Sequence, residues 1–121
     1  MNILQISFHT APMNSLGVND GGGLNVYVES ISKELAKDNT VHIITGEQAK
    51  NISKKNLKLS SFNLFTNQAN TEEKKEFLDE FIEKTFQYIE EHEIDVVHAH
   101  YWLSGLVAKE IKQRYKIPFI F

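Results

Sequence analysis

The chain contains no cysteine, so neither a disulfide framework nor a zinc–thiolate site is available to it. It has no apolar run near the roughly 20 residues that a membrane-spanning helix needs, and no basic segment of the signal-peptide type opens it. Excess positive charge is also absent, because the formal net charge is −3. Such a balance provides no broad attraction for nucleic acid or anionic membranes. We therefore expect a cytoplasmic protein that has no transmembrane segment and does not bind nucleic acid.

The composition that is present is that of one ordinary globular domain, with 41% hydrophobic and 24% charged residues in 121 positions. Short apolar runs alternate with stretches whose apolar residues recur every three or four positions. They predict strands at residues 3–8, 41–45, 94–98 and 117–121, a further strand around 57–62, and helices at 23–38, 71–91 and 103–115. Strands alternating with helices indicate an α/β fold with three layers and a parallel sheet.

Two details of this pattern carry further expectations. Thr71, followed by two acidic residues, is the predicted N-cap of the second helix. The chain stops within the apolar run 117–121, whereas most domains do not end inside a buried strand. We therefore expect residues 1–121 to be a piece of a longer protein.

Three glycines in a row, Gly21 to Gly23, stand directly before the first predicted helix, flanked by Asp20 and Asn25. Bare backbone amides at a helix N-terminus allow a phosphate or a sugar hydroxyl to approach closely. A flexible loop that needs positive φ explains the glycines equally well. The dinucleotide fingerprint fits poorly, because a long loop separates the glycines from the first strand, and no Gly-Lys-Ser/Thr follows to make a P-loop.

The second informative stretch is VHAHYWLSG at residues 97–105. His98 and His100 share one face of a strand end, but no third ligand is evident, so we expect no metal site. Tyr101 and Trp102 follow, and aromatic residues at such a junction are usually core, although a tyrosine hydroxyl there is also typical of sugar binding. His9 ends the first strand, where a structural role is the more common one. Since all these segments follow strand ends, we expect them to face one crevice with His9 between.

Three stretches, ISFHTAP at 6–12, DGGGLNVY at 20–27 and HAHYWLSG at 98–105, resemble the N-terminal domain of retaining GT-B glycosyltransferases of family 4. The patterns are nearest to those of the D-inositol-3-phosphate (mycothiol) glycosyltransferases and more distant from sucrose-phosphate synthase and sucrose synthase. The resemblance covers most of the chain and is weakest at 46–93. It implies a Rossmann-like acceptor-side domain in residues 1–121, without the C-terminal domain that holds most of the nucleotide-sugar in such enzymes.

The resemblance also implies residue roles. Acceptor contacts are expected from His9, Asp20, Gly21, Gly22, Gly23, Leu24, Asn25 and Tyr101, and contacts to a UDP-linked nucleotide-sugar from Ser15, Leu16 and Gly23. No cofactor and no protein nucleophile are expected. In the resembled enzymes a lysine before the long helix holds the acceptor phosphate. Here Thr71 takes that position, with Lys74 and Lys75 nearby, so the sequence leaves open whether the acceptor is phosphorylated. A ligand-binding or interaction module that kept the fold without the chemistry is the alternative.

Overall fold

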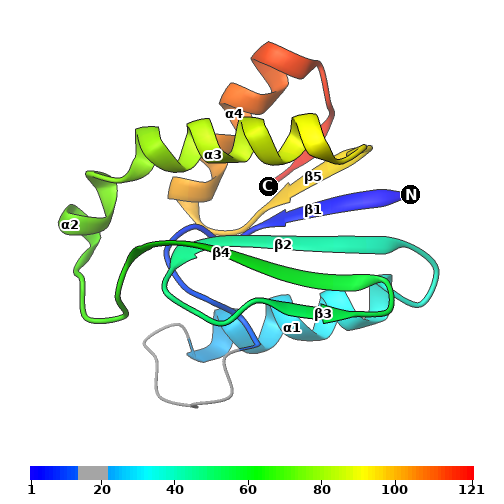
Figure 1. The fold of residues 1–121 in the computed structure, drawn as a ribbon, viewed down its shortest axis with the longest axis horizontal. Helices are drawn as coiled ribbons and strands as arrows, with labels where there is room; N and C mark the ends of the chain where they lie inside the picture. The colour runs from blue at the N-terminus through cyan, green and yellow to red at the C-terminus, as the bar shows by residue number, and fades with distance from the viewer. Residues whose placement is uncertain (14–21) are drawn as a thin grey trace.

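A computed structural model of the chain describes residues 1–13 and 22–121, and its described strands form one sheet through the middle of the molecule (Figure 1). The strand order is β3-β4-β2-β1-β5-β6. The bounds are β1 Asn2–Ile6, β2 Thr40–Glu47, β3 Ile52–Lys54, β4 Leu57–Phe65, β5 Val96–Ala99 and β6 Phe119–Ile120. All the predicted strands are therefore present, with shifted ends.

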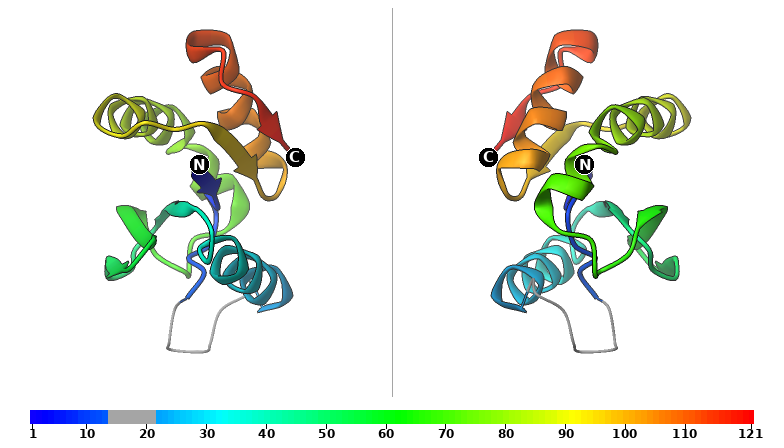
Figure 2. Two further views of the ribbon diagram at one scale, coloured as in Figure 1. Left: turned by 90° about the vertical axis from the view of Figure 1, so that its right-hand side faces the viewer. Right: turned by 90° about the vertical axis from the view of Figure 1, so that its left-hand side faces the viewer.

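Helices cover both faces of this sheet, with α1 on one side and α3 and α4 on the other (Figure 2). Their bounds, with those of the short α2, are α1 Gly22–Leu35, α2 Thr71–Lys75, α3 Leu78–Glu91 and α4 Trp102–Tyr115. Because successive strand residues face opposite sides, Ile43 packs with Leu35 of α1, whereas Ile44 joins the core that contains Phe81 and Leu103. The predicted Rossmann-like, three-layer α/β architecture is confirmed.

Parallel pairing brings the carboxyl ends of the central strands to one edge of the sheet. β1 pairs in parallel with β2 on one side and with β5 on the other, so that Ile6 lies opposite both Ile44 and Ala99. β5 in turn pairs in parallel with β6. The four strands predicted as parallel neighbours are therefore neighbours, and the segments that follow β1, β2 and β5 meet at the same edge.

The segment between β2 and α2 differs from the prediction. Residues 46–70 appeared irregular in sequence apart from one strand at 57–62, but β4 extends to Phe65 and the short β3 pairs with it in antiparallel fashion. Lysine, asparagine and serine residues interrupt the apolar pattern here, because β3 lies at an edge and the exposed positions of β4 alternate with buried ones. The sheet is thus mixed at this margin and parallel elsewhere.

The long helix predicted at 71–91 is two helices, and its predicted cap is wrong. α2 ends before Glu76, and α3 starts after Phe77, whose φ of −98° and ψ of 4° interrupt the helical path. Asn70, rather than Thr71, is the N-cap: its side chain accepts a hydrogen bond from the Glu73 N–H at 2.9 Å, and its own N–H donates to Glu73 Oε1 at 3.0 Å. This reciprocal capping box satisfies two amides at once.

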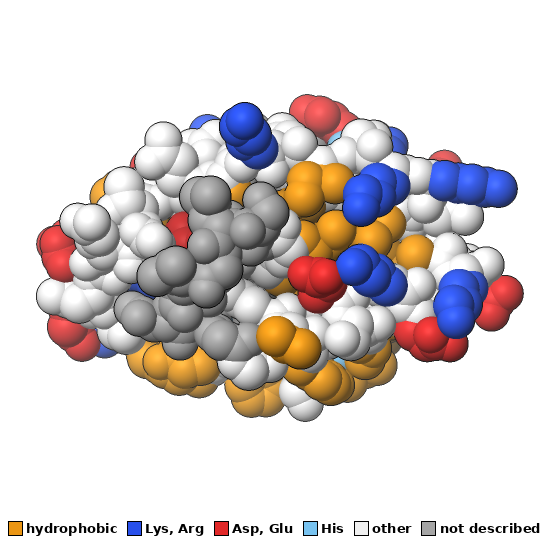
Figure 3. Space-filling model, turned by 90° about the horizontal axis from the view of Figure 1, so that it is seen from below, with side chains coloured by type: hydrophobic (Ala, Val, Ile, Leu, Met, Phe, Trp, Pro, Cys, Tyr) orange, Lys and Arg blue, Asp and Glu red, His pale blue; other side chains and the backbone are white. Residues whose placement is uncertain are grey.

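The face seen from below in Figure 1, where α1 lies, has a mixed surface (Figure 3). Basic, acidic and hydrophobic side chains all occur on it, and α1 itself exposes Val26 and Tyr27. No helix in residues 1–13 and 22–121 is both long and apolar enough to cross a bilayer.

Candidate functional site

The loop after β1 is held in place by its neighbours. Phe8 is fully buried between Phe65 and Phe81, whose rings meet it edge to face at centroid distances of 5.3 and 4.9 Å. Its N–H donates to Ser104 Oγ of α4 at 2.9 Å. Anchored in this way, Phe8 places the next residue, His9, at the carboxyl edge of the sheet.

His9 stacks on Tyr101, the residue that precedes α4. Their ring centroids are 4.1 Å apart and the planes are inclined by 29°. Burial, together with the nearby charge of Lys74, lowers the pKa of His9 from 6.5 to about 4, so the imidazole is neutral at physiological pH. Its Nδ1 atom is buried and finds no hydrogen-bond partner among the described residues. A neutral ring with one unused nitrogen can therefore bond to a ligand.

Tyr101 has an unusual backbone conformation, with φ of 75° and ψ of 151°. Non-glycine residues avoid this region, which costs roughly 1–3 kcal/mol, and structures retain such strain mostly at functional sites. The preceding residue, His100, donates its N–H to Ile6 O at 3.0 Å, and the Gly105 N–H bonds to Tyr101 O at 3.1 Å. The strained residue is thus held from both sides, and its ring remains partly exposed at the rim.

Asn25 lies in the first part of α1 and is only 7% exposed. Its amide points toward the β1 loop, where Nδ2 donates to Thr10 Oγ1 at 3.0 Å. The amide oxygen Oδ1 finds no partner within the described part of the chain. Nearby, a Cβ added to Gly23 would meet no atom of the described residues within 4 Å.

His98 and His100 do lie together, with ring centroids 4.1 Å apart. Burial lowers the pKa of both rings, and the neighbouring His98 adds to the effect on His100, whose pKa falls to about 4. His100 Nε2 lies 2.6 Å from Gln5 Oε1, and Tyr27 of α1 meets the same ring edge to face. Within residues 1–13 and 22–121 no three side chains of the histidine, cysteine, aspartate or glutamate type converge as metal ligands would.

A cavity of about 240 Å³ opens beside His9 on the side of α2. Its lining residues come from the ends of β1 and β2 and from the segment before and within α2: His9, Thr10, Glu47, Asn67, Ala69, Asn70, Thr71 and Lys74. The Lys74 ammonium donates to His9 O at 2.6 Å and lies 5.3 Å from the centre of the Phe65 ring. The charged residues in its lining are one cation, Lys74, and one carboxylate, Glu47, and the cavity adjoins the stacked pair.

Comparison with known proteins agrees with this geometry. The model of Glycosyltransferase Family 4 matches residues 21–121. The chain belongs to this family. It is 32% identical to the D-inositol 3-phosphate glycosyltransferase of Frankia alni over 93% of its own length and 30% of that protein, and 32% identical to that of Corynebacterium diphtheriae over 99% and 30%. The chain therefore spans less than a third of the length of these relatives.

The fold is shared with a solved structure. Sucrose-phosphate synthase from Thermosynechococcus elongatus superposes with a TM-score of 0.85 at 24% identity, covering 98% of this chain and 31% of that one. At that identity the likeness concerns the fold alone. The Rossmann-like arrangement of this family 4 chain is thus shared with a longer protein.

The structure brings together only part of the predicted family 4 site. His9 and Tyr101 stack, and Asn25 reaches the β1 loop through Thr10. Gly22 begins α1, and Leu24 is half-buried within it. The remaining predicted residues, Ser15, Leu16, Asp20 and Gly21, lie outside the described residues.

Near α2, the structure separates the residues that the sequence grouped. Thr71 and Lys74 line the cavity, whereas Lys75 lies over the Trp102 ring and pairs with Glu72. Sequence reasoning missed Glu47 and Asn67. Correct ends for β2 and β4 would have found them, because Glu47 is the last residue of β2 and Asn67 follows the end of β4, both at the ligand-binding edge.

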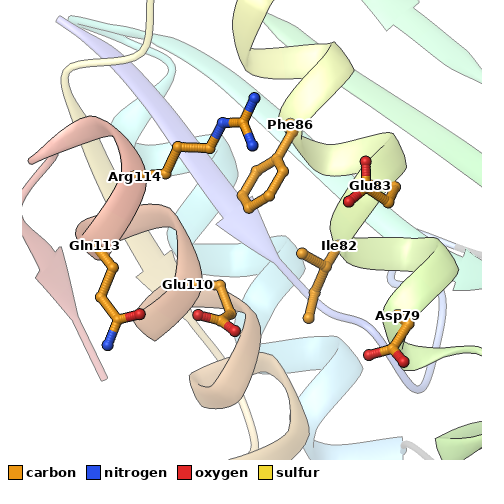
Figure 4. A pocket seen from close by; sticks show the side chains of 7 residues that line it. All are labelled: Asp79, Ile82, Glu83, Phe86, Glu110, Gln113 and Arg114. Carbon is orange, nitrogen blue, oxygen red and sulfur yellow. The ribbon is translucent and has the colours of Figure 1, made fainter.

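A larger hollow of about 580 Å³ lies elsewhere, between α3 and α4 (Figure 4). It is lined by Asp79, Ile82, Glu83, Phe86, Glu110, Gln113 and Arg114. The Arg114 guanidinium lies 4.6 Å from the centre of the Phe86 ring. This hollow contains no predicted site residue and lies on the outer helices rather than at the strand ends, so its size does not make it the family 4 site.

Proposed function

We propose that this chain is the acceptor-side part of a glycosyltransferase that moves a sugar, with retention, from a nucleotide-sugar to a hydroxyl of a small acceptor such as a sugar, an inositol or a sugar phosphate. Membership of the family supports sugar transfer in general. The observation that carries the acceptor role is a pair of buried polar atoms, His9 Nδ1 and Asn25 Oδ1, which have no partner among the described residues and lie at one edge of the sheet. Buried polar atoms are rarely left unpaired, and sugar hydroxyls are suited to pair with both.

Each residue then has a physical role in acceptor binding. Asn25 Oδ1 accepts a hydrogen bond from an acceptor hydroxyl. The His9 imidazole is neutral at physiological pH because its pKa is about 4. Its Nδ1 can therefore form a hydrogen bond to the acceptor while the ring adds no charge to the site. The partly exposed ring of Tyr101 provides an apolar face for the C–H groups of a sugar ring.

The donor is expected at the N-terminus of α1. The first amides of a helix have no partner within the helix and carry partial positive charge. Gly22 and Gly23 begin α1, and no atom of the described residues lies within 4 Å of a Cβ added to Gly23, so a diphosphate could approach the backbone there. In this proposal Ser15, Leu16 and Gly23 contact a UDP-linked donor, most of whose binding comes from a second, C-terminal domain. We assign no protein nucleophile, no metal and no cofactor, and we expect the reaction to take place in the cytoplasm.

Lys74 favours an acceptor that carries an anionic group. An ammonium has three donors, and one of those of Lys74 is used by His9 O. Lys74 borders the cavity together with Thr71 and Asn67. The Glu47 carboxylate lines the same cavity and accepts the Ala11 N–H at 3.0 Å. The relatives at 32% identity are named for D-inositol 3-phosphate, and we extend that acceptor class, a phosphorylated polyol, to this chain.

Ligand-observed NMR on the 121-residue chain tests the acceptor role, with myo-inositol, myo-inositol phosphate and glucose as probes. We expect saturation transfer to the polyols, strongest for the phosphate, and a loss of roughly 1–3 kcal/mol in binding free energy for Asn25→Ala, the range for an unpaired buried group. Ser32→Ala is the matched control, since Ser32 is a buried α1 residue whose hydroxyl also has no partner among the described residues. Equal binding by the two variants, or none by the natural chain, overturns the proposal.

A further inference from the structure

Gln5 is a polar residue in the middle of an apolar strand, and among the described asparagine and glutamine residues it is the most buried. Its side chain is fully excluded from solvent. It stands in the centre of β1, opposite Ile43 on one side and His98 on the other. Such a position ordinarily holds an aliphatic residue, so the presence of an amide calls for an explanation.

The amide of Gln5 makes one hydrogen bond and leaves a donor unused. Oε1 lies 2.6 Å from Nε2 of His100, a residue 95 positions further along the chain. Nε2 of Gln5 is buried without a partner in the described part of the chain. An unpaired buried donor destabilises a fold, so Gln5 is a costly choice for stability alone.

The contact decides which tautomer His100 adopts. Since a carbonyl oxygen only accepts, His100 must donate from Nε2, and a neutral imidazole has a single N–H. His100 is therefore fixed to β1 twice: through its side chain to Gln5, and through its backbone N–H to Ile6 O at 3.0 Å. Tyr27 of α1 also packs its ring edge to face with the His100 ring.

His100 directly precedes the strained Tyr101. A residue at φ of 75° and ψ of 151° keeps that conformation only if its neighbours hold it there. On the carboxyl side α4 does so, because the Gly105 N–H bonds to Tyr101 O. On the amino side the doubly bound His100 is the anchor, and the result is the Tyr101 ring lying on His9.

We propose that Gln5 is a positioning residue of the acceptor site: by holding His100 as its Nε2–H tautomer, it keeps Tyr101 strained and stacked on His9. The role in acceptor binding rests on the proposed function, whereas the effect on His100 and on the stack does not. A structural role in the core alone would be served as well by leucine. The proposal requires instead that leucine preserve the fold and disturb the site.

Histidine-detected NMR on the 121-residue chain tests the proposal with two substitutions. Gln5→Leu removes the oxygen that accepts the hydrogen bond of His100, so we expect His100 to become a mixture of tautomers. The cross-peaks between the Tyr101 and His9 rings should weaken several-fold. The melting temperature should stay equal or rise. Gln5→Glu keeps an acceptor oxygen and adds a charge. Because a carboxylate favours the protonated imidazole, we expect the pKa of His100 to rise and the stack to remain. Thr85→Val, which replaces another buried polar group bonded away from the site, is the control and should change neither signal.

Binding of myo-inositol phosphate to the same variants separates this proposal from the proposed function. Weaker binding by Gln5→Leu, with binding retained by Gln5→Glu and Thr85→Val, supports both. If the natural chain binds no polyol but Gln5→Leu still disrupts the tautomer and the stack, the proposed function fails and the positioning of Tyr101 by Gln5 stands. An unchanged His100 tautomer and an intact stack in Gln5→Leu overturn the role of Gln5, as does an unchanged His100 titration in Gln5→Glu.

Discussion

The ring of Tyr101 lies on the ring of His9 at a centroid distance of 4.1 Å, and this contact joins the segment after β1 to the segment after β5. The two segments are neighbours because β1 and β5 pair in parallel, with Ile6 opposite Ala99. The contact is accompanied by backbone strain on the Tyr101 side, so the arrangement costs free energy that a purely structural turn would avoid. Several measurable consequences depend on this balance.

Tyr101→Gly should stabilise the chain and weaken acceptor binding. Glycine adopts positive φ without steric cost, so relief of the strain is expected to raise the free energy of unfolding by up to roughly 1–3 kcal/mol, less the contribution of the lost ring contact. Urea unfolding and titration with myo-inositol phosphate measure the two effects. Lys116→Gly is the control: Lys116 is the C-cap of α4 with φ of 61°, so glycine should stabilise there too, with binding unchanged. A Tyr101→Gly chain that binds as well as the natural one would remove Tyr101 from the site.

Gly23→Val should impair ligand binding at α1 far more than it impairs folding. Among the described residues the added side chain meets no atom within 4 Å, and valine has a higher helix propensity than glycine, so the fold should lose little stability. The same side chain would occupy the space through which a diphosphate reaches the backbone. The contrast is Gly105→Val, where a Cβ would lie 2.7 Å from the Phe121 ring and the fold itself should suffer. Thermal melts and titration with UDP-glucose distinguish the two variants. If Gly23→Val lowers the melting temperature as much as Gly105→Val does, the glycine run is structural.

Asn70→Ala should destabilise the chain by about 1 kcal/mol, the usual cost of losing an N-cap, and Thr71→Ala should have a much smaller effect. The reason is that Asn70, not Thr71, accepts the Glu73 N–H. Because Asn70, Thr71 and Lys74 all line the cavity beside His9, loosening α2 should also reduce the preference for phosphorylated over unphosphorylated polyols. Equilibrium unfolding of both variants measures the first effect. A larger loss in Thr71→Ala than in Asn70→Ala would contradict the observed cap.

Acid should destabilise this fold as the pH falls below 6.5, because three buried or partly buried histidines must then take up protons. Burial lowers the pKa of His9, His42 and His100 from 6.5 to about 4, with nearby positive charge adding to the effect. A histidine whose pKa is lower in the folded than in the unfolded state contributes fully to the free energy of unfolding above pH 6.5. This contribution is lost as the pH falls toward 4. The loss is at most about 1.4 kcal/mol per pH unit for each histidine.

His42 offers the cleanest test of this pH dependence, since it lies at the opposite end of β2 from the site. Its Nδ1 atom is 2.7 Å from the Tyr88 hydroxyl. His42→Gln should flatten the fall in the free energy of unfolding between neutral pH and about pH 4.5, while the exposed Lys54→Gln should leave that slope unchanged. An unaltered slope in His42→Gln would mean that His42 is not buried as a neutral ring.

Local sequence alone determined the layers of this protein. Apolar runs at the positions of β1, β2, β5 and β6 and the spacing of apolar residues between them predicted a parallel sheet with helices on both faces, and the structure has that sheet. The pattern suffices because a central parallel strand is buried on both faces and is therefore mostly apolar, with Gln5 in β1 as an exception. The same topology implied that His9 and the segment ending in Tyr101 would meet at one edge.

Tertiary structure decided what local pattern does not encode. The short edge strand β3 and the last residues of β4 were not predicted, because neither presents a continuous apolar run. The Asn70 cap, by contrast, is a local feature that the sequence could have given, since Asn70 and Glu73 lie three residues apart. The inward turn of Asn25, the strain at Tyr101 and the contact between Gln5 and His100 depend on register and packing between segments far apart in the chain. Periodicity reports which face of an element is buried; the partner that a buried polar atom finds there depends on which strands become neighbours and at what register.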